Sequence, residues 1–432
     1  MFKKIGIFAL LLSFALLVSA CSGPTGDGAA PATDADTESI DLVFAWWGNP
    51  LRNQMTYDVL LLFEAEHPHI TVEQHTVGWG DYWSMLATMA AGGNLPDVIQ
   101  MADTHLGQYV ANNLLIDLEP MINSGAINMS DVDPLLITLG RVGDGIFDIS
   151  IGVNANSMGY NKTLLDSMDI TLEYHMTMDD FIDVARHIHN ISGYRTLFPS
   201  FLLEFMIRAR GYVMYTEEGL GGQPEYYQEF FEILAMGIEE GWIIPPEALA
   251  GRTGMEESPI FFGSEPGFRT WNAFPWSSQL TVYQSQAPEG MELALTTIPT
   301  RNPRLSNLVR SGQSLSITTH SNHPNEAAMI IDFFTNSIEA NEILLAERGL
   351  PISSVVSQAI YPLVDESTQR ADYFVNQVMT PYSSPPNPAR PEESPMVENH
   401  LTLLTEMVSH GTMTPADATR DLFDFANSVF GN

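Results

Sequence analysis

The sequence predicts an α/β protein built around a mostly parallel sheet. Strand-like segments at 41–48, 70–74 and 97–101 alternate with helix-like segments at 53–66 and 82–91. This order of strand, helix, strand, helix, strand is typical of a parallel sheet with helices on its faces. The chain has 432 residues, of which 45% are apolar, so we expect two or three domains with sizeable cores.

Each of these segments has its own boundary signals. Residues 41–48 form a short apolar run that ends at Gly48, as expected for a buried strand. The first helix must stop before Pro68, because proline cannot continue a helix. The second helix stops at Gly92 and Gly93. Ligands of such sheets bind at the carboxyl ends of the strands, so polar and aromatic residues there are site candidates.

The middle of the chain, about 154–295, is more helical. Thr177 and Asp180 form a capping-box pattern, so we interpret the acidic pair Asp179 and Asp180 as a helix start rather than a site. Beyond residue 295 we expect a strand at 314–318, helices at 324–335 and 338–348, and two further helices that end the chain.

The N-terminus predicts export and attachment to a membrane. Lys3 and Lys4 precede an apolar run at 5–18 that is too short to span a bilayer. The residues that follow, Ser19, Ala20 and Cys21, resemble the lipobox of bacterial lipoproteins, in which the cysteine carries a diacylglycerol. An ordinary signal peptide with a chance cysteine is the alternative. We therefore expect a signal peptide at 1–20 and a lipidated Cys21 followed by a flexible tether, at 21–39.

The charge balance excludes nucleic acid as a partner. The chain carries 18 lysines and arginines against 53 aspartates and glutamates, a formal net charge of −35. Affinity for nucleic acid comes mainly from cations that neutralise phosphates, and this surface repels them. We interpret the acidity as a solvated face that keeps an exported protein soluble.

Several segments resemble the family 1 type of extracellular solute-binding proteins that serve carbohydrate ABC importers. Near the start these are 63–72 (FEAEHPHITV), 78–83 (GWGDYW) and 91–101 (AGGNLPDVIQM). The later ones are 152–155 (GVNA), 159–162 (GYNK), 321–328 (SNHPNEAA), 331–336 (IDFFTN) and 347–351 (ERGLP). The segment 339–351, with Trp46, Trp47 and 81–83, is most similar to members that bind pectin-derived oligosaccharides of the rhamnogalacturonan type.

This resemblance implies two α/β lobes, a hinge, and a ligand cleft between the lobes. It places the first part of lobe 1 at 40–150, the main part of lobe 2 at 151–300 and a return to lobe 1 at 301–350. The C-terminal helices at 351–432 then complete the lobes and hinge. The implied function is capture of a carbohydrate and its delivery, by lobe closure, to ABC permease subunits. The implied protein is a monomer, anchored to the membrane by lipid, that performs no catalysis and uses no cofactor.

The candidate ligand residues follow from the chemistry of sugars. A sugar ring offers an apolar face and a belt of hydroxyls, so it needs flat aromatic surfaces with carboxylates and amides. The candidates are Trp46, Trp47, Asp81, Tyr82, Trp83, Asp103, Trp271, Asn272, Trp276, Arg310 and Gln313. For each tryptophan, packing in the core is the alternative role. Asp81 could instead cap a helix. Arg310 could form a salt bridge within the protein instead of binding the carboxylate of a uronate.

Three other classes of function compete with this interpretation. A carbohydrate-active enzyme needs two positioned carboxylates, but with so many acidic residues coincidental pairs are unavoidable. Metal capture is weakly indicated by histidines at 67, 69, 75, 187 and 189, whose spacing points them in different directions. A surface adhesin is the third alternative, and it would bind an intact polymer rather than a short oligosaccharide.

Overall fold

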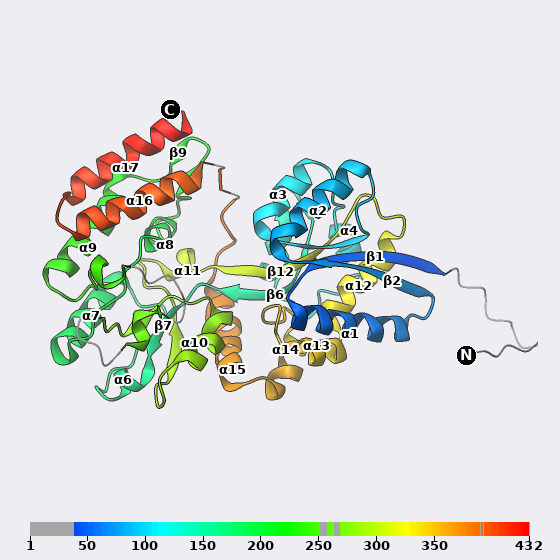
Figure 1. The fold of residues 1–432 in the computed structure, drawn as a ribbon, viewed down its shortest axis with the longest axis horizontal. Helices are drawn as coiled ribbons and strands as arrows, with labels where there is room; N and C mark the ends of the chain where they lie inside the picture. Colours follow the sequence, from blue (N-terminus) through cyan, green and yellow to red (C-terminus); the bar gives the residue numbers. More distant parts are fainter. Residues whose placement is uncertain (1–38, 251–256, 263–267, 389, 392, 432) are drawn as a thin grey trace, which may run out of the picture. The chain divides into compact units, whose positions relative to one another are not determined.

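The computed structural model describes residues 39–250, 257–262, 268–388, 390–391 and 393–431 (Figure 1). The predicted signal peptide, Cys21 and nearly all of the tether lie outside the described residues. Among those that are described, no helix is long and apolar enough to cross a membrane.

A five-stranded sheet forms the centre of the first lobe. Its strand order is β2 (Ile70–Val77), β1 (Ile40–Trp47), β3 (Val98–Met101), β12 (Val309–Ile317) and β6 (Ile149–Ala155). β1 pairs in parallel with both β2 and β3, as the sequence predicts. β12 runs antiparallel to β3 and to β6, so the late strand enters the sheet in the opposite direction.

The helices between these strands begin earlier than the periodicity indicates. α1 (Pro50–Glu66) starts with proline in its first turn, where proline is tolerated, and Asn49 caps it by accepting a hydrogen bond from the Arg52 amide. α2 (Trp79–Gly92) ends at Gly93, whose φ of 71° is the left-handed conformation that favours glycine at a helix C-terminus. α1 and α2 each lengthen the predicted helix at its start.

The two faces of the five-stranded sheet are covered by separate apolar clusters. Leu42 and Phe44 of β1 pack with α1 and with α12 (Pro324–Asn336) in one cluster. Ala45 of β1 packs in the other with α2 and α3 (Asp103–Ala111). Successive residues of a strand point to opposite faces, and here both faces are buried.

The second lobe has a smaller sheet and its own core. β7 (Met158–Asn161) lies between β10 (Asn272–Ala273) and β11 (Leu293–Thr296), antiparallel to both. α7 (Met178–Ser192) begins with the predicted capping box of Thr177 and Asp180, which the structure confirms. A buried cluster around Phe181, Phe230, Trp242 and Trp271 packs in this lobe. Leu293 and Leu295 of β11 belong instead to the cluster that contains the core of the first sheet.

The C-terminal helices divide between the two cores. α16 (Ser394–Ser409) and α17 (Pro415–Phe430) pack on α9 (Pro224–Glu239) in the second lobe (Figure 1). The segment at 371–379 contributes buried side chains to the core of the first sheet. The two-lobe α/β fold class is thus confirmed, whereas the exact domain boundaries stay predictions.

The remaining elements are short. Up to residue 220 they are α4 (Glu119–Ser124), α5 (Pro134–Ile137), η1 (Thr138–Gly140), β4 (Arg141–Val142), β5 (Gly145–Ile146), α6 (Lys162–Asp166), α8 (Leu202–Arg208), β8 (Tyr215–Thr216) and β9 (Gly219–Leu220). Beyond it they are η2 (Pro246–Ala248), η4 (Pro259–Phe261), η5 (Ser277–Gln279), α10 (Leu280–Gln286), α11 (Pro303–Ser306), α13 (Ile338–Leu344), α14 (Ser354–Ile360), η6 (Tyr361–Leu363), α15 (Glu366–Tyr373), the π-helical turn η7 (Phe374–Met379) and η8 (Thr380–Tyr382).

Candidate ligand-binding site

Two predicted site residues, Asp103 and Trp276, lie beside the guanidinium of a third, Arg310, and we call these three residues the Arg310 group. Asp103 opens α3 directly after β3, and Arg310 lies on β12, the neighbouring strand. The Arg310 guanidinium donates to Oδ2 of Asp103 from Nε at 3.1 Å and from Nη2 at 2.5 Å. Its Cζ also lies 5.7 Å from the centroid of the Trp276 ring. The salt bridge weighed for Arg310 is therefore present.

The Arg310 group is accessible to solvent. The side chains of Arg310 and Asp103 are each 37% exposed, and Trp276 is half-buried. An ion pair at this exposure contributes little to stability because water screens it. The group is thus a polar and aromatic surface whose ion pair is open to exchange with another anion.

A buried carboxyl lies beside the Arg310 group. Asp148, at the start of the β6 region, is 2% exposed, and its Oδ2 accepts a hydrogen bond from the Ser314 hydroxyl at 2.6 Å. Its Oδ1 has no hydrogen-bond partner among the described residues. Burial is the main cause that raises the pKa of Asp148 to about 7; the hydrogen bond from Ser314 opposes this rise and the charge of Asp103 adds to it. No sequence pattern marked this residue.

A second aromatic surface stands at the carboxyl ends of β1 and β2. We define the aromatic cluster as Trp47, Trp79, Trp83 and His105. The ring centroids of Trp47 and Trp79 are 4.9 Å apart, and those of Trp83 and His105 are stacked at 3.6 Å. Trp79 is 48% exposed, so it offers free ring surface, whereas Trp47 is 7% exposed. The sequence candidates omitted Trp79 and His105, although Trp79 stands in the GWGDYW motif.

Two candidates in the same region are core residues instead. Trp46 is 1% exposed, packs on Phe44, and donates from its indole nitrogen to Asn53 at 3.0 Å. Tyr82 is fully buried, and its hydroxyl lies 3.0 Å from the Ala45 carbonyl oxygen and 2.8 Å from that of Gln100. Burial also raises the pKa of Tyr82, so the phenol stays neutral. Trp46 therefore has the core-packing role that was its alternative, and the candidate Tyr82 is likewise a core residue.

Asp81 is exposed in the first turn of α2 and does not cap it. The helix has no side-chain hydrogen bond at its N-cap, which is Gly78. Its carboxylate lies near the positive end of the helix dipole, a favourable position for an acidic side chain. Asp81 therefore stays a candidate beside the aromatic cluster.

Gln313 belongs to a buried polar hub rather than to a ligand surface. It is 7% exposed, and its Oε1 accepts a hydrogen bond from Nη1 of Arg348 at 2.6 Å. Arg348 is 3% exposed and also donates to Gln100 and Thr56. Burial lowers the pKa of Arg348 to about 9. The hub connects α1, β3 and β12, so we assign Gln313 a structural role.

Trp271 and Asn272 stabilise the second lobe from inside. Trp271 is fully buried, and its indole nitrogen donates to the Thr196 hydroxyl at 2.8 Å. The side chain of Asn272, also fully buried, accepts from the Leu197 amide at 2.8 Å and donates to the Leu197 carbonyl at 3.1 Å. The prediction that these two residues line a ligand site is therefore replaced by a core role.

The residues considered for metal binding do not gather. Among the described residues, no group of three or more histidines, cysteines, aspartates or glutamates is placed to hold a metal ion. His75 instead lies 2.9 Å from Glu73, and His189 lies 3.2 Å from the Tyr194 carbonyl.

Two α/β lobes, each built on its own sheet, define the class of fold found in periplasmic solute-binding proteins. Residues 45–202 match the family model of the bacterial extracellular solute-binding proteins. The family resemblance that the sequence motifs within this range indicate is thereby confirmed.

Solved structures share the fold over nearly the whole chain. A family 1 extracellular solute-binding protein from Alicyclobacillus acidocaldarius has a TM-score of 0.82 at 21% identity, over 92% of this chain and 100% of that one. A periplasmic oligogalacturonide binding protein from Yersinia enterocolitica has a TM-score of 0.74 at 22% identity, over 90% and 99%. A structure described as a de novo designed cysteine esterase has a TM-score of 0.78 at 21% identity, over 92% and 99%. At these identities the likeness concerns the fold alone.

Proposed function

We propose that the protein binds an acidic, uronate-containing oligosaccharide outside the cytoplasm and delivers it to an ABC importer. The family match at 45–202 and the two-lobe fold support solute binding. The observation that carries the choice of ligand is the Arg310 group, in which a solvent-accessible guanidinium lies over an aromatic ring. The oligogalacturonide binding of the similar Yersinia protein supports the same choice.

The chemistry of the Arg310 group suits a sugar acid. A guanidinium presents a planar fork that pairs with a carboxylate through two hydrogen bonds. Arg310 now directs Nε and Nη2 at one oxygen of Asp103, so a ligand carboxylate that offers both of its oxygens can replace this contact. The Trp276 ring then supplies apolar surface for the face of the sugar.

The Arg310 group also joins elements of both lobes. Asp103 and Arg310 belong to the five-stranded sheet region, whereas Trp276 follows β10 of the second sheet and forms an isolated bridge with Asn156. A ligand that contacts both sides favours the closed arrangement by the difference in its affinity for the two states. Closure of this kind is what a transporter needs to distinguish loaded from empty protein.

A melting experiment tests the proposed ligand class. Trigalacturonate is expected to raise the melting temperature of the purified protein, because binding to the native state alone stabilises it, by about 2.7 kcal/mol at a hundred times the dissociation constant. Galactotriose, the neutral match of the same length, is expected to shift it much less. Equal shifts would remove the charge-based choice of ligand, and release of new reducing ends would favour an enzyme.

The lipid anchor is a separate part of the proposal and rests on the sequence around Cys21. Replacement of Cys21 by alanine is expected to release the protein from the membrane fraction while oligosaccharide binding stays unchanged. Fractionation of cells followed by immunoblotting measures this. Retention of the Cys21→Ala protein in the membrane fraction would contradict the anchor.

A further inference from the structure

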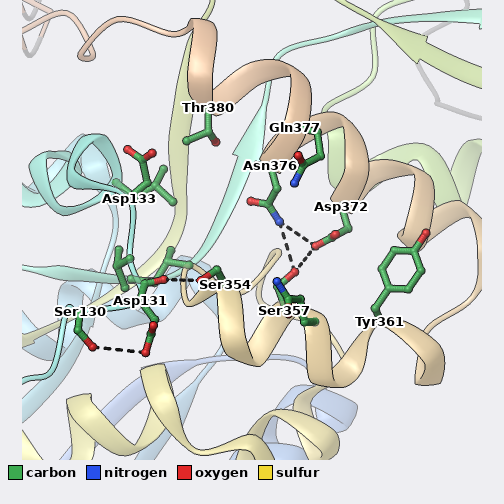
Figure 2. A pocket seen from close by; sticks show the side chains of 14 residues that line it. Ser130, Asp131, Asp133, Ser354, Ser357, Tyr361, Asp372, Asn376, Gln377 and Thr380 are labelled. Carbon is green, nitrogen blue, oxygen red and sulfur yellow. Dashed lines mark hydrogen bonds between the residues drawn. The ribbon is translucent and has the colours of Figure 1, made fainter.

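A polar pocket of about 580 Å³ lies apart from the Arg310 group and the aromatic cluster. One wall is the segment 130–136 of the first lobe, and the others are α14 and the π-helical turn η7 (Figure 2). An isolated bridge between Val132 and Ser353 fixes the first wall against the start of α14. The volume is within the range of small-molecule sites.

The lining carries oxygen and amide groups but no cation. Its polar members include the carboxylates of Asp131, Asp133 and Asp372 and the amides of Gln358 and Gln377. Val132, Leu136 and Ile352 add an apolar portion. Because no lysine, arginine or histidine is present, three carboxylates repel an anionic ligand such as a uronate. The pocket is therefore chemically distinct from the Arg310 group.

Part of the pocket is a fixed hydrogen-bonded frame. Asp372 accepts hydrogen bonds from the Ser357 hydroxyl at 2.5 Å and from the Asn376 amide at 2.9 Å (Figure 2). Burial raises the pKa of Asp372. Because these groups bond to one another, this wall is formed without a ligand. Unlike Asp103 in the Arg310 group, no lining carboxylate has to leave an ion pair with a described residue before a ligand binds.

Other lining groups have spare hydrogen-bonding capacity. In the part of the chain that the structure describes, the side-chain amides of Gln358 and Gln377 form no hydrogen bond. Each amide offers both donors and an acceptor. Tyr361 is 42% exposed at the rim and supplies a flat ring. Gln377 itself comes from η7, and π-helical turns occur frequently at functional sites.

We propose that this pocket binds a neutral polyhydroxylated molecule of about one sugar ring, with its hydroxyls on Gln358, Gln377 and the carboxylates and its apolar face on Tyr361. Hydroxyl groups both donate and accept, which matches a lining that mixes carboxylates with amides. A metal ion is disfavoured because no ligand set of three or more His, Cys, Asp or Glu occurs among the described residues. The site is independent of the proposed oligosaccharide function.

Saturation-transfer NMR with galactose, rhamnose and myo-inositol, and with galacturonate as the charged match of galactose, tests the pocket. At least one neutral probe is expected to bind, and galacturonate is expected not to compete with it. The double variant Tyr361→Ala/Gln377→Ala is expected to weaken that binding at least about five-fold, since it removes a ring contact and an amide. Tyr57→Ala is the matched control, because Tyr57 on α1 is also 42% exposed.

The variants separate this proposal from that for the Arg310 group. Neutral-probe binding that survives Trp276→Ala but is lost in the double variant supports the pocket, whatever trigalacturonate does. The proposal is overturned if none of the three neutral probes binds, or if their binding persists in the double variant. Displacement of the probe by calcium or spermidine would likewise overturn the assignment to a neutral ligand. Both replaced side chains are exposed, so an unchanged melting temperature is expected and confirms folding.

Discussion

Replacement of Arg310 by glutamine is expected to weaken trigalacturonate binding about 10- to 100-fold, because hydrogen bonds to charged groups contribute roughly 1.5–3 kcal/mol. Galactotriose lacks the carboxylate, so its affinity is expected to change less than about three-fold. Calorimetric titration of both ligands measures the difference. The larger loss for the acidic ligand is what assigns the guanidinium of Arg310 to a ligand carboxylate.

Arg420 offers a matched control for the loss of one positive charge. Its side chain is 67% exposed and, within the residues that the structure describes, bonds only to Asp417 of the same helix, α17. Arg420→Gln therefore lowers the net charge as Arg310→Gln does but is expected to leave both affinities unchanged. Equal weakening by the two variants would indicate a long-range charge effect, and equal weakening of both ligands by Arg310→Gln would contradict carboxylate recognition.

Replacement of Trp271 by alanine is expected to destabilise the second lobe by about 3–5 kcal/mol, the usual effect of removing a large buried aromatic side chain. The variant leaves a cavity beside Phe181 and deprives the Thr196 hydroxyl of its donor. A large fall in melting temperature measures the effect. The structure therefore assigns Trp271 to stability, although its position in the sequence suggested a ligand role.

Trp79 is the matched control for Trp271, because its replacement is expected to affect binding rather than stability. Because it is 48% exposed, Trp79→Ala is expected to change stability by less than about 1 kcal/mol and to weaken oligosaccharide binding about ten-fold through loss of ring contact. A Trp271→Ala protein that melts like the wild type would refute the core assignment. Unchanged affinity in Trp79→Ala would remove the aromatic cluster from the site.

The sequence located the strand ends but not the faces of the side chains. In β1 every residue from Leu42 to Trp47 is apolar or aromatic, because both faces of the sheet are covered, and only Asp41 near the start of the strand is polar and exposed. No polar alternation marks which face is the core. Trp46 and Trp47 are adjacent in the chain, so the sequence predicts the same ligand role for both. In the structure they lie on opposite faces of the sheet: Trp46 packs on Phe44, whereas Trp47 contacts Trp79.

Long-range contacts explain the remaining differences. Asp103 and Arg310 are 207 residues apart, and only the pairing of β3 with β12 brings them together. Trp271 and Asn272 are candidates as an aromatic ring and an amide, but β10, which begins at Asn272, pairs with β7, and both residues are buried. Gln313 is a candidate because an amide suits sugar hydroxyls, whereas the buried Arg348 that donates to it lies in a later segment. The residue types indicate which side chains could bind a sugar, but the local sequence does not show which distant residues they contact.

The structure of the protein in complex with trigalacturonate tests whether Arg310 binds a uronate. We expect one uronate carboxylate within hydrogen-bonding distance of the Arg310 guanidinium, with the sugar ring against Trp276. We also expect that Asp103 no longer accepts both hydrogen bonds from Arg310. A complex in which the carboxylates contact other groups, and the pair of Asp103 and Arg310 stays as it is here, would contradict it.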